Sequence, residues 1–426
     1  MRSLYTLIIY LFVPFVLARL YFLGFKNPAY RSRWQERFGF FKWEKQNKPV
    51  LWLHAVSVGE VNAAKPVISK LLEQYSNYQI LVTTVTPTGA YTIKQHFSED
   101  ITHLYLPYDL PFSVKRFLDL VKPSVLITME TEIWPNLYQS CCVTNVPILI
   151  VNARLSEKSS KGYQLVSSLM KQTLSKVSII AAQTKSDAER FISFGANKEK
   201  VVVAGNLKFD ITVPHSITEQ AESLKRYFSV NRPVWIAAST QEGEEEIILK
   251  AHQEVIKKHP NTILILAPRH PDRVTKVTSL CDAAKLKYIK RTEDKSFPDE
   301  CSLYILDTLG ELQVHYAASQ IAFVGGSLVN TGGQNMMEPA SLGLPVISGQ
   351  YTYNFTEVTQ LLTENDALIV VSNAEELAMK VNVMLSDANL RHNMGEKGRK
   401  VIEENKGNLK RLMEIIEPYL SRSETN

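Results

Sequence analysis

Short apolar segments recur along the chain from residue 49, separated by segments with helical spacing. Continuous apolar runs bounded by turn residues are typical of strands buried on both faces. Strands that alternate with helices predict a parallel, doubly wound α/β fold, present here twice. The apolar runs are 50–56, 79–86, 103–108, 124–130, 147–153, 178–183 and 201–205, then 233–239, 261–269, 286–291, 302–307, 320–327, 344–349 and 367–372. The helical segments of the first half are 61–75, 88–97, 112–120, 134–144, 163–175 and 186–194.

A polar segment without strand character separates the two halves. It divides the chain into four parts. They are a first Rossmann-like domain, expected to bind an acceptor, a linker, a second Rossmann-like domain, and a terminal packing helix with a tail. Two such domains are expected to face a cleft, with ligands at the carboxyl ends of the strands. The expected boundaries are 26–212, 213–232, 233–407 and 408–426.

The first 25 residues differ from the rest of the chain. Residues 3–25 are apolar with one charge, Arg19, and have about the length of a membrane-spanning helix, although Pro14 interrupts them. No cleavage site with small residues follows, which argues against a removed signal peptide. Positive residues follow this segment, so the positive-inside rule places the remaining chain in the cytoplasm. A helix lying in the membrane plane would give the same location.

Composition narrows the possible partners. The chain has 426 residues, a net charge of +5 and a pI near 8.7, which suits a phosphorylated ligand or an anionic membrane surface and does not by itself indicate nucleic acid. Arg31, Arg33, Arg37, Lys158 and Lys161 are candidates for headgroup contact, or simply a solvated basic face. The four Cys and nine His have neither zinc-type nor disulfide-type spacing, so we expect no metal site.

Candidate binding residues of the second half follow its strands. Arg269 follows one strand, and Arg offers a planar fork that matches phosphate. Gly310 and Glu311 follow another strand. A glycine-rich loop then precedes a helix, a combination that lets backbone approach a phosphate while a carboxylate accepts ribose hydroxyls. Its residues are Gly325, Gly326, Gly332, Gly333, Asn335 and Glu338. Ordinary turns with a capped helix are the alternative interpretation.

The first half places charged and amide residues after its strands instead. Glu60 opens the helix after the first strand, where complementing the helix dipole is the simpler role. Charges grouped at one sheet edge are costly unless they pair or bind something polar, so the choice is a structural ion-pair network or a catalytic site for group transfer. In the catalytic interpretation, a carboxylate takes the proton of an acceptor hydroxyl. The remaining residues are Glu130, Glu132, Asn152, Arg154, Asn206, Lys208 and Asp210.

The order of these motifs resembles the 3-deoxy-D-manno-octulosonic acid (Kdo) transferase family over essentially the whole chain. The shared motifs are LWLHAVSVGE, TPTGA, YLPYDLP, METEIWPNL, NARLSEKS, GNLKFD, PVWIAAST, EGEEE, APRHPDR, DTLGEL and FVGGSLV with GGQN and MEPA. The resemblance implies a GT-B architecture and an inverting, metal-independent transfer without a cofactor. It also implies CMP-Kdo as donor, a lipid A precursor (lipid IVA) as acceptor in lipopolysaccharide synthesis, and attachment to the cytoplasmic face of the inner membrane.

The resemblance also implies residue roles. Glu60 matches the family's general base, and Glu130 and Lys208 match its pair that stabilises the transition state. The family usually has G-G-H-N-P-L-E in the glycine-rich loop, whereas this chain has Gln334 for the His and Met336 for the Pro, which leaves the donor contacts there open. The implied CMP-binding residues are Pro268, Arg269, Leu309, Gly310, Glu311, Asn335, Met336, Met337 and Glu338.

Two other functions remain open at the level of sequence. One is another GT-B glycosyltransferase, or an epimerase, that uses a UDP-sugar; a donor screen separates it from Kdo transfer. The other is a membrane-anchored binding protein that keeps the fold without catalysis. The joint presence of Glu60, Glu130 and Lys208 argues against the second, because a site that has lost catalysis tends to lose its acid or base residues.

Overall fold

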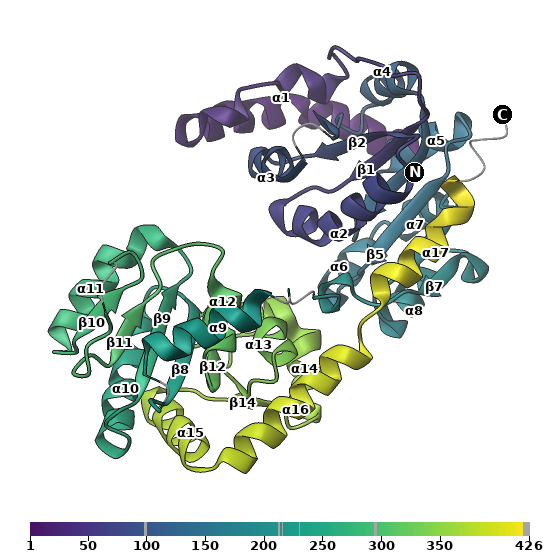
Figure 1. The fold of residues 1–426 in the computed structure, drawn as a ribbon. Coiled ribbons are helices and arrows are strands. Elements are labelled where there is room, and N and C mark those ends of the chain that lie inside the picture. The colour runs from purple at the N-terminus through teal and green to yellow at the C-terminus, as the bar shows by residue number, and fades with distance from the viewer. Residues whose placement is uncertain (98–99, 212–213, 215, 230, 294–295, 421–426) are drawn as a thin grey trace. The chain divides into compact units, whose positions relative to one another are not determined.

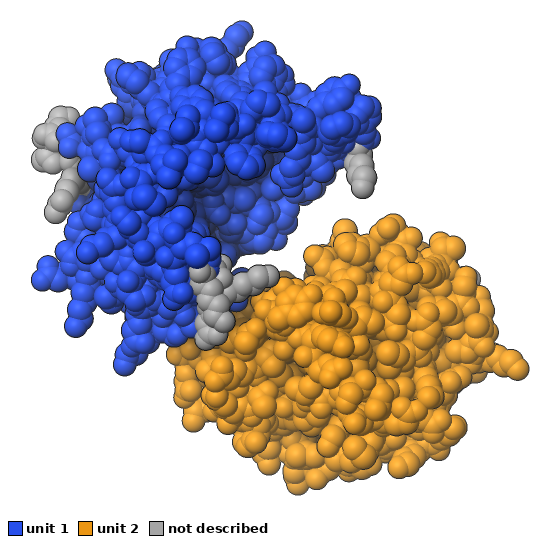
Figure 2. Space-filling view, turned by 180° about the vertical axis from the view of Figure 1, so that it is seen from behind, with its two compact units in different colours: residues 1–210, 407–426 blue, residues 211–406 orange. Residues whose placement is uncertain are grey.

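The computed structural model describes residues 1–97, 100–211, 214, 216–229, 231–293 and 296–420. The chain forms two compact units, shown in different colours in Figure 2. Unit 1 comprises residues 1–210 and 407–426, and unit 2 comprises residues 211–406. Each unit contains one parallel seven-stranded sheet with helices on its faces (Figure 1). This confirms the two doubly wound α/β halves expected from the sequence.

Sheet A, the sheet of unit 1, has the strand order β3-β2-β1-β4-β5-β6-β7. The winding reverses between β1 and β4, and open α/β sheets bind ligands outside the carboxyl ends of strands at such a switch point. Every expected strand of this half is present. The strands are β1 (Val50–His54), β2 (Gln79–Thr84), β3 (Thr102–Tyr105), β4 (Pro123–Met129), β5 (Ile148–Ala153), β6 (Ile179–Ala182) and β7 (Val201–Val203).

Alternate residues of sheet A enter two hydrophobic cores, as the two-residue period of a strand requires. Leu51 and Leu53 pack with α2, α3 and α17, whereas Val50 and Trp52 pack with α4, α5, α7 and α8. The helices of unit 1 are α1 (Arg2–Lys26), α2 (Val58–Gln74), α3 (Pro87–Phe97), α4 (Pro111–Val121), α5 (Pro135–Val143), α6 (Glu157–Gln164), α7 (Ser167–Leu174), α8 (Lys185–Ser193) and α17 (Asn408–Leu420).

Sheet B, the sheet of unit 2, has the strand order β10-β11-β9-β8-β12-β13-β14, and its switch point lies between β8 and β12. Every strand expected in this half is present as well; β8 is shifted by one residue from its apolar run, and the others are shorter than theirs. The strands are β8 (Val234–Thr240), β9 (Ile263–Pro268), β10 (Tyr288–Lys290), β11 (Leu303–Ile305), β12 (Ile321–Val324), β13 (Val346–Ser348) and β14 (Leu368–Val370).

Sheet B is also covered on both faces. Trp235 and Ala237 pack with α10, α11 and α15, whereas Val234 and Ile236 pack with Tyr316 of α12 and with Phe228 just after α9. The helices of unit 2 are α9 (Ser216–Tyr227), α10 (Glu245–Lys258), α11 (Val274–Ala283), α12 (Leu312–Ala317), α13 (Met337–Ser341), α14 (Thr356–Glu364), α15 (Ala374–Ser386) and α16 (Ala388–Glu404).

Two segments differ from the sequence-based expectation. The helix expected over 163–175 is two helices, α6 and α7, with the exposed Leu165 between them. The expected linker, 213–232, contains helix α9, which buries Ile217 and Ala221 and belongs to unit 2. These two residues are four positions apart and therefore share one face of the helix, a pattern that the polar composition of the segment concealed.

The terminal helix α17 joins unit 1 although it follows unit 2 in the chain (yellow in Figure 1). Its Leu412, Ile416 and Leu420 belong to the same core as α2, and the hydroxyl of Tyr78 donates a hydrogen bond to the Leu420 carbonyl. The sequence predicted a packing helix here, and its partner is the first unit rather than the adjacent one.

Helix α1 is long and apolar enough to cross a membrane, judged by length and composition. Its first turns are tied to unit 1, because Tyr5 donates to the buried Asp109 at 2.9 Å and Thr6 donates to Asn136 at 3.0 Å. Large apolar side chains are nevertheless exposed along the whole length of the helix. They include Leu4, Leu7, Ile8, Leu11, Phe12, Phe15, Phe22 and Phe25.

One of the three arginines considered for headgroup contact does not reach the surface. Arg37 is buried, its Nη2 donates to the Val85 carbonyl at 2.7 Å, and its guanidinium lies 4.3 Å from the centre of the Tyr105 ring. Arg37 therefore stabilises unit 1 and cannot face a membrane. Arg31 and Arg33 are exposed, and the side chains of the candidates Lys158 and Lys161 lie outside the described ones.

Candidate active site

Glu60 lies in the first turn of α2, directly after β1 at the switch point of sheet A. Its Oε2 accepts the Val56 N–H at 2.8 Å, and the Ser57 hydroxyl lies 3.4 Å from its Oε1. A glutamate at the third helical position that reaches back to a backbone N–H is a common cap. Glu60 therefore has the simpler structural role of capping the start of α2, but its surroundings also change its affinity for a proton.

The affinity of Glu60 for a proton is high. Burial is the main cause that raises the pKa of Glu60 to about 8. The carboxylates of Glu132 and Glu130 contribute to the rise, and the hydrogen bond from the Val56 N–H opposes it. A carboxyl group with a pKa near the working pH is suited to accept a proton during a reaction.

Glu130 follows β4, the other strand at this switch point, and adopts a left-handed backbone conformation with φ 54°. Non-glycine residues rarely adopt this conformation, and such strain is concentrated at functional sites. Burial raises the pKa of Glu130, whereas the positive charges of Lys208 and Arg154 oppose the rise. The structure thus brings together Glu60, Glu130, Arg154 and Lys208 from four separate segments of the chain.

Glu132 connects this cluster to a residue that the sequence analysis did not consider. Its Oε2 accepts the Trp134 indole N–H at 3.0 Å and lies 3.9 Å from His54 Nε2. The His54 ring is fully buried at the end of β1, with Nδ1 2.9 Å from Thr83 Oγ1. Its Nε2 has no hydrogen-bond partner among the described residues. The position of His54 near the end of the first apolar run, three residues before Ser57 of the S-V-G-E motif, was the available signal.

The remaining polar residues of this edge shape the backbone. Asn152 accepts the Leu207 N–H, and Asn206 accepts the Lys208 N–H at 3.1 Å, so both fix the short turn that presents the Lys208 side chain. Asp210 accepts backbone N–H groups at the start of α17. Asp210 therefore caps a helix and is not part of the carboxylate cluster.

Arg269 follows β9 at the carboxyl edge of sheet B. Its backbone N–H donates to the Thr240 carbonyl at 3.0 Å, which fixes its backbone beside the switch point. The Arg269 side chain is exposed, and within the described part of the chain no hydrogen bond or ion pair engages it. The preceding Pro268 is buried. Arg269 is thus available to an anionic ligand.

The segment Leu309–Glu311 follows β11 at the same edge. Leu309 is 74 % exposed, and Gly310 has φ +88°, a conformation that favours glycine. Burial would raise the pKa of Glu311, but hydrogen bonds from Thr308 and Arg291 outweigh it and lower that pKa. The Glu311 carboxylate is therefore ionised and already paired. Gly310 and Glu311 line a pocket of about 590 Å³ in unit 2.

Asn335 and Glu338 form a connected pair at the start of α13. Asn335 Nδ2 donates to Glu338 Oε1 at 2.9 Å, and Asn335 Oδ1 accepts the Met337 N–H at 3.1 Å. Burial raises the pKa of Glu338, and the Asn335 bond partly offsets the rise. Met336 and Met337 have buried side chains, so only their backbone is able to touch a ligand.

The glycine-rich loop differs from its sequence-based interpretation. The N–H groups of Gly326, Ser327 and Leu328 already donate to Glu244, at 2.6, 2.9 and 2.8 Å. Glu244 is fully buried, and its Oε2 also accepts the Gln241 N–H at 2.9 Å. These loop N–H groups therefore do not cradle a phosphate, because a carboxylate of the protein occupies their position. No local signal reveals this contact, since Glu244 and Gly326 are 82 residues apart.

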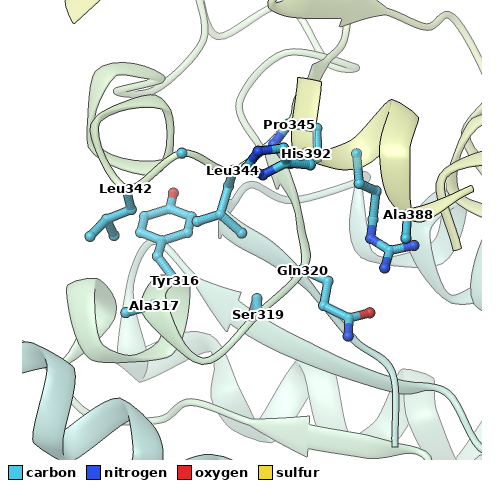
Figure 3. Close-up of a pocket in the computed structure, with 11 residues that line it drawn as sticks. Tyr316, Ala317, Ser319, Gln320, Leu342, Leu344, Pro345, Ala388 and His392 are labelled. Atoms are coloured by element: carbon cyan, nitrogen blue, oxygen red, sulfur yellow. The ribbon is translucent and has the colours of Figure 1, made fainter. Parts of the chain in front are cut away.

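A second pocket, of about 250 Å³, lies away from these residues (Figure 3). Gln320 and Pro345, which line it, directly precede β12 and β13, so it opens at the amino edge of sheet B. None of the predicted site residues lines it. Within the described residues, no group of three or more His, Cys, Asp or Glu side chains is placed to hold a metal ion.

Comparisons with known proteins match the chain in both halves. Residues 32–211 match the family described as 3-deoxy-D-manno-octulosonic-acid transferase, and residues 231–401 match glycosyl transferases group 1. The 3-deoxy-D-manno-octulosonic acid transferase of Haemophilus influenzae is 40 % identical over 99 % of both chains.

Solved structures share the two-domain fold. A glycosyltransferase from Rickettsia africae has a TM-score of 0.56 and 15 % identity, covering 89 % of this chain and 100 % of its own. The UDP-GlcNAc 2-epimerase from Neisseria meningitidis has a TM-score of 0.57 and 16 % identity, covering 86 % of this chain and 100 % of its own. At this identity the likeness concerns the fold alone, which hosts more than one reaction.

Proposed function

Since this chain belongs to the Kdo transferase family of glycosyltransferases, we propose that it transfers Kdo from CMP-Kdo to the lipid A precursor lipid IVA, with inversion at the anomeric carbon. The observation that carries the proposal beyond the family is the cluster at the switch point of sheet A, where the pKa of Glu60 is raised to about 8. A carboxylate there is suited to act as the base for an acceptor hydroxyl.

In the proposed reaction, the Glu60 carboxylate takes the proton of the acceptor hydroxyl. The acceptor oxygen forms a bond to the anomeric carbon of Kdo, and the bond from that carbon to the CMP phosphate oxygen breaks. CMP leaves with the electron pair of that bond. Attack from the face opposite the leaving group inverts the anomeric configuration, and no metal or cofactor takes part.

Positive groups balance the negative charge that develops. Lys208 and Glu130, which influence each other electrostatically, are assigned to stabilising the transition state. Arg269, exposed and unpaired among the described residues, is assigned to the CMP phosphate, where a guanidinium matches the oxygen geometry. The segments 309–311 and 335–338 complete the proposed CMP site.

The proposed location is the cytoplasmic face of the inner membrane, with α1 as the anchor. The length and composition of α1 and its exposed apolar side chains support this. Arg31 and Arg33, exposed just after α1, are suited to anionic headgroups. The hydrogen bonds of Tyr5 and Thr6 to unit 1 favour a helix whose first turns stay at the protein surface.

The test is transfer from CMP-Kdo to a tetra-acylated lipid A precursor by the full chain in detergent, with EDTA and without added metal. Mass spectrometry of the product identifies the transferred sugar and counts the residues added. We expect a mass increase equal to one or more Kdo units. A folded protein that binds CMP but transfers nothing would contradict the proposal, and a screen of UDP-sugars would then test the alternative donor class.

A further inference from the structure

Glu244 is a buried carboxylate whose hydrogen-bonding capacity is filled. Its Oε2 accepts the N–H groups of Gln241 and Gly326, and its Oε1 accepts those of Ser327 and Leu328. A buried charge is costly unless the protein supplies such partners. The loop after β12 is therefore held in the one arrangement that satisfies the charge.

The close approach of the loop to Glu244 explains one of the glycines. A Cβ atom on Gly325 would lie 2.9 Å from Glu244 Oε2 and 2.8 Å from the Ser239 carbonyl oxygen, which is closer than real Cβ contacts. Only glycine allows β8, β12 and the Glu244 side chain to meet at this point. Gly325 thus allows the loop to approach the Glu244 carboxylate, an anion of the protein itself, rather than a bound phosphate.

A second set of contacts links this arrangement to the proposed donor site. The Gly326 carbonyl accepts the Gly333 N–H at 2.6 Å and the Thr331 hydroxyl at 2.9 Å. Two residues after Gly333, Asn335 begins the pair with Glu338 that we assign to CMP. Gly326 therefore links Glu244 to the donor-site segment. Its N–H group donates to Glu244, and its carbonyl group accepts the Gly333 N–H.

We propose that Glu244 is a positioning residue for the donor: its buried carboxylate fixes residues 326–328 and, through the Gly326 carbonyl, the segment 334–338. This inference rests on the proposed function, because it concerns binding of CMP-Kdo. It also implies that side chains such as Arg269 bind the phosphate of the donor, since the N–H groups of residues 326–328 already donate to Glu244.

Glu244→Gln is the decisive variant because it keeps the shape of the side chain. In the parent, each carboxylate oxygen of Glu244 accepts two backbone N–H groups. In the variant, one of these oxygens is replaced by an NH₂ group, which cannot accept them, whichever way the amide is oriented. In either orientation two backbone N–H groups lose their acceptor, and at least one of them belongs to the loop, so the loop is expected to move. Glu242→Gln is the matched control, since Glu242 is exposed on the same turn and its ion pair is with Lys276 at the surface.

The experiment measures kcat and the KM for CMP-Kdo, together with CMP affinity by calorimetry and the thermal unfolding midpoint. For Glu244→Gln we expect the KM and the Kd for CMP to rise at least about ten-fold, with kcat within about two-fold of the parent, as for loss of hydrogen bonds to a charged group. Glu242→Gln should match the parent in every quantity. A folded Glu244→Gln enzyme with parental KM, or with a fall in kcat alone, would overturn the proposal.

A second variant covers the case in which Glu244→Gln does not fold. Thr331→Val removes one bond to the Gly326 carbonyl at an exposed residue and leaves Glu244 intact, so a rise of about three-fold in the donor KM is expected. A parental KM in Thr331→Val would then refute the link to the donor site. Failure of the proposed function itself is distinct, since the parent would bind CMP without transferring Kdo.

Discussion

A glutamate follows the first strand of each switch-point pair, Glu60 after β1 in sheet A and Glu244 after β8 in sheet B. The two carboxylates differ in the number of backbone N–H groups that reach them. Among the described residues, one such bond reaches Glu60, from Val56, whereas four reach Glu244. The neighbours of Glu60 are other carboxylates, while Glu244 is enclosed by backbone donors.

This difference shows that residue type and topological position do not fix the role of a carboxylate. Burial with few donors, together with negative neighbours, raises the pKa of Glu60 to about 8, so that it is able to accept a proton near neutral pH. A full set of donors makes Glu244 a fixed structural anion. If the comparison is right, substitutions at the edge of sheet A change kcat, and those at the edge of sheet B change donor binding.

The largest expected effect is that of Glu60→Gln, which removes the base and keeps the size of the side chain. We expect kcat to fall about 10³-fold, within the range for loss of general base catalysis. The KM for CMP-Kdo should stay within about two-fold, because the donor residues lie on sheet B. Initial-rate measurements give both quantities, and Glu73→Gln, an exposed residue of the same helix, is the control.

Thermal unfolding provides an independent check on the same variant. The folded-state pKa of Glu60 is raised from 4.5 to about 8, so the parent loses stability as the pH rises between these values, where the buried group must ionise. Glu60→Gln stays neutral and should unfold at a higher temperature than the parent above pH 8, with little difference below pH 4.5. Equal midpoints at both pH values would show that the pKa of Glu60 is not raised.

The next effect is that of Lys208→Ala. It removes a positive charge that lowers the pKa of Glu130, and with it the proposed charge stabilisation of the transition state. We expect kcat to fall about 10²-fold with a nearly unchanged donor KM. Lys198→Ala, at an exposed residue before β7, serves as the control in the same rate assay. A change confined to the donor KM would place Lys208 in the donor site instead.

Arg269→Ala tests the other side of the comparison. Loss of a guanidinium that binds the donor phosphate should raise the KM for CMP-Kdo about ten-fold or more and weaken CMP binding in calorimetry, while kcat changes little. Lys276→Ala removes a nearby surface cation that pairs with Glu242 and should have no effect. An unchanged KM would exclude Arg269 from the donor site.

The smallest effect is a shift in pH dependence on Glu132→Gln. The Glu132 carboxylate raises the pKa of Glu60, so removing its charge should move the acidic limb of the kcat/KM profile to lower pH, by about one unit or less. The profile is measured from pH 5 to 9 with the parent alongside. A shift to higher pH would mean that Glu132 acts on Glu60 in another way, for example through His54.

The local features of the molecule follow from the sequence. All the strands of both sheets lie within the apolar runs that predict them or within one residue of them, because strand formation depends on short apolar segments between turn residues. The candidate site residues that follow strands, such as Glu60, Glu130 and Arg269, were predicted for the same reason: in parallel sheets the carboxyl ends of strands share one edge.

Only the tertiary structure decided what those residues do for one another. Glu244 and Gly326 are 82 residues apart, and Asp210 caps a helix that begins almost 200 residues later. The membership of α17 in unit 1 and the burial of His54 beside Glu132 are likewise invisible in the chain. A sequence determines where polar groups occur, but their proton affinity and freedom depend on burial and on donors supplied by distant segments, which exist only once the chain has folded.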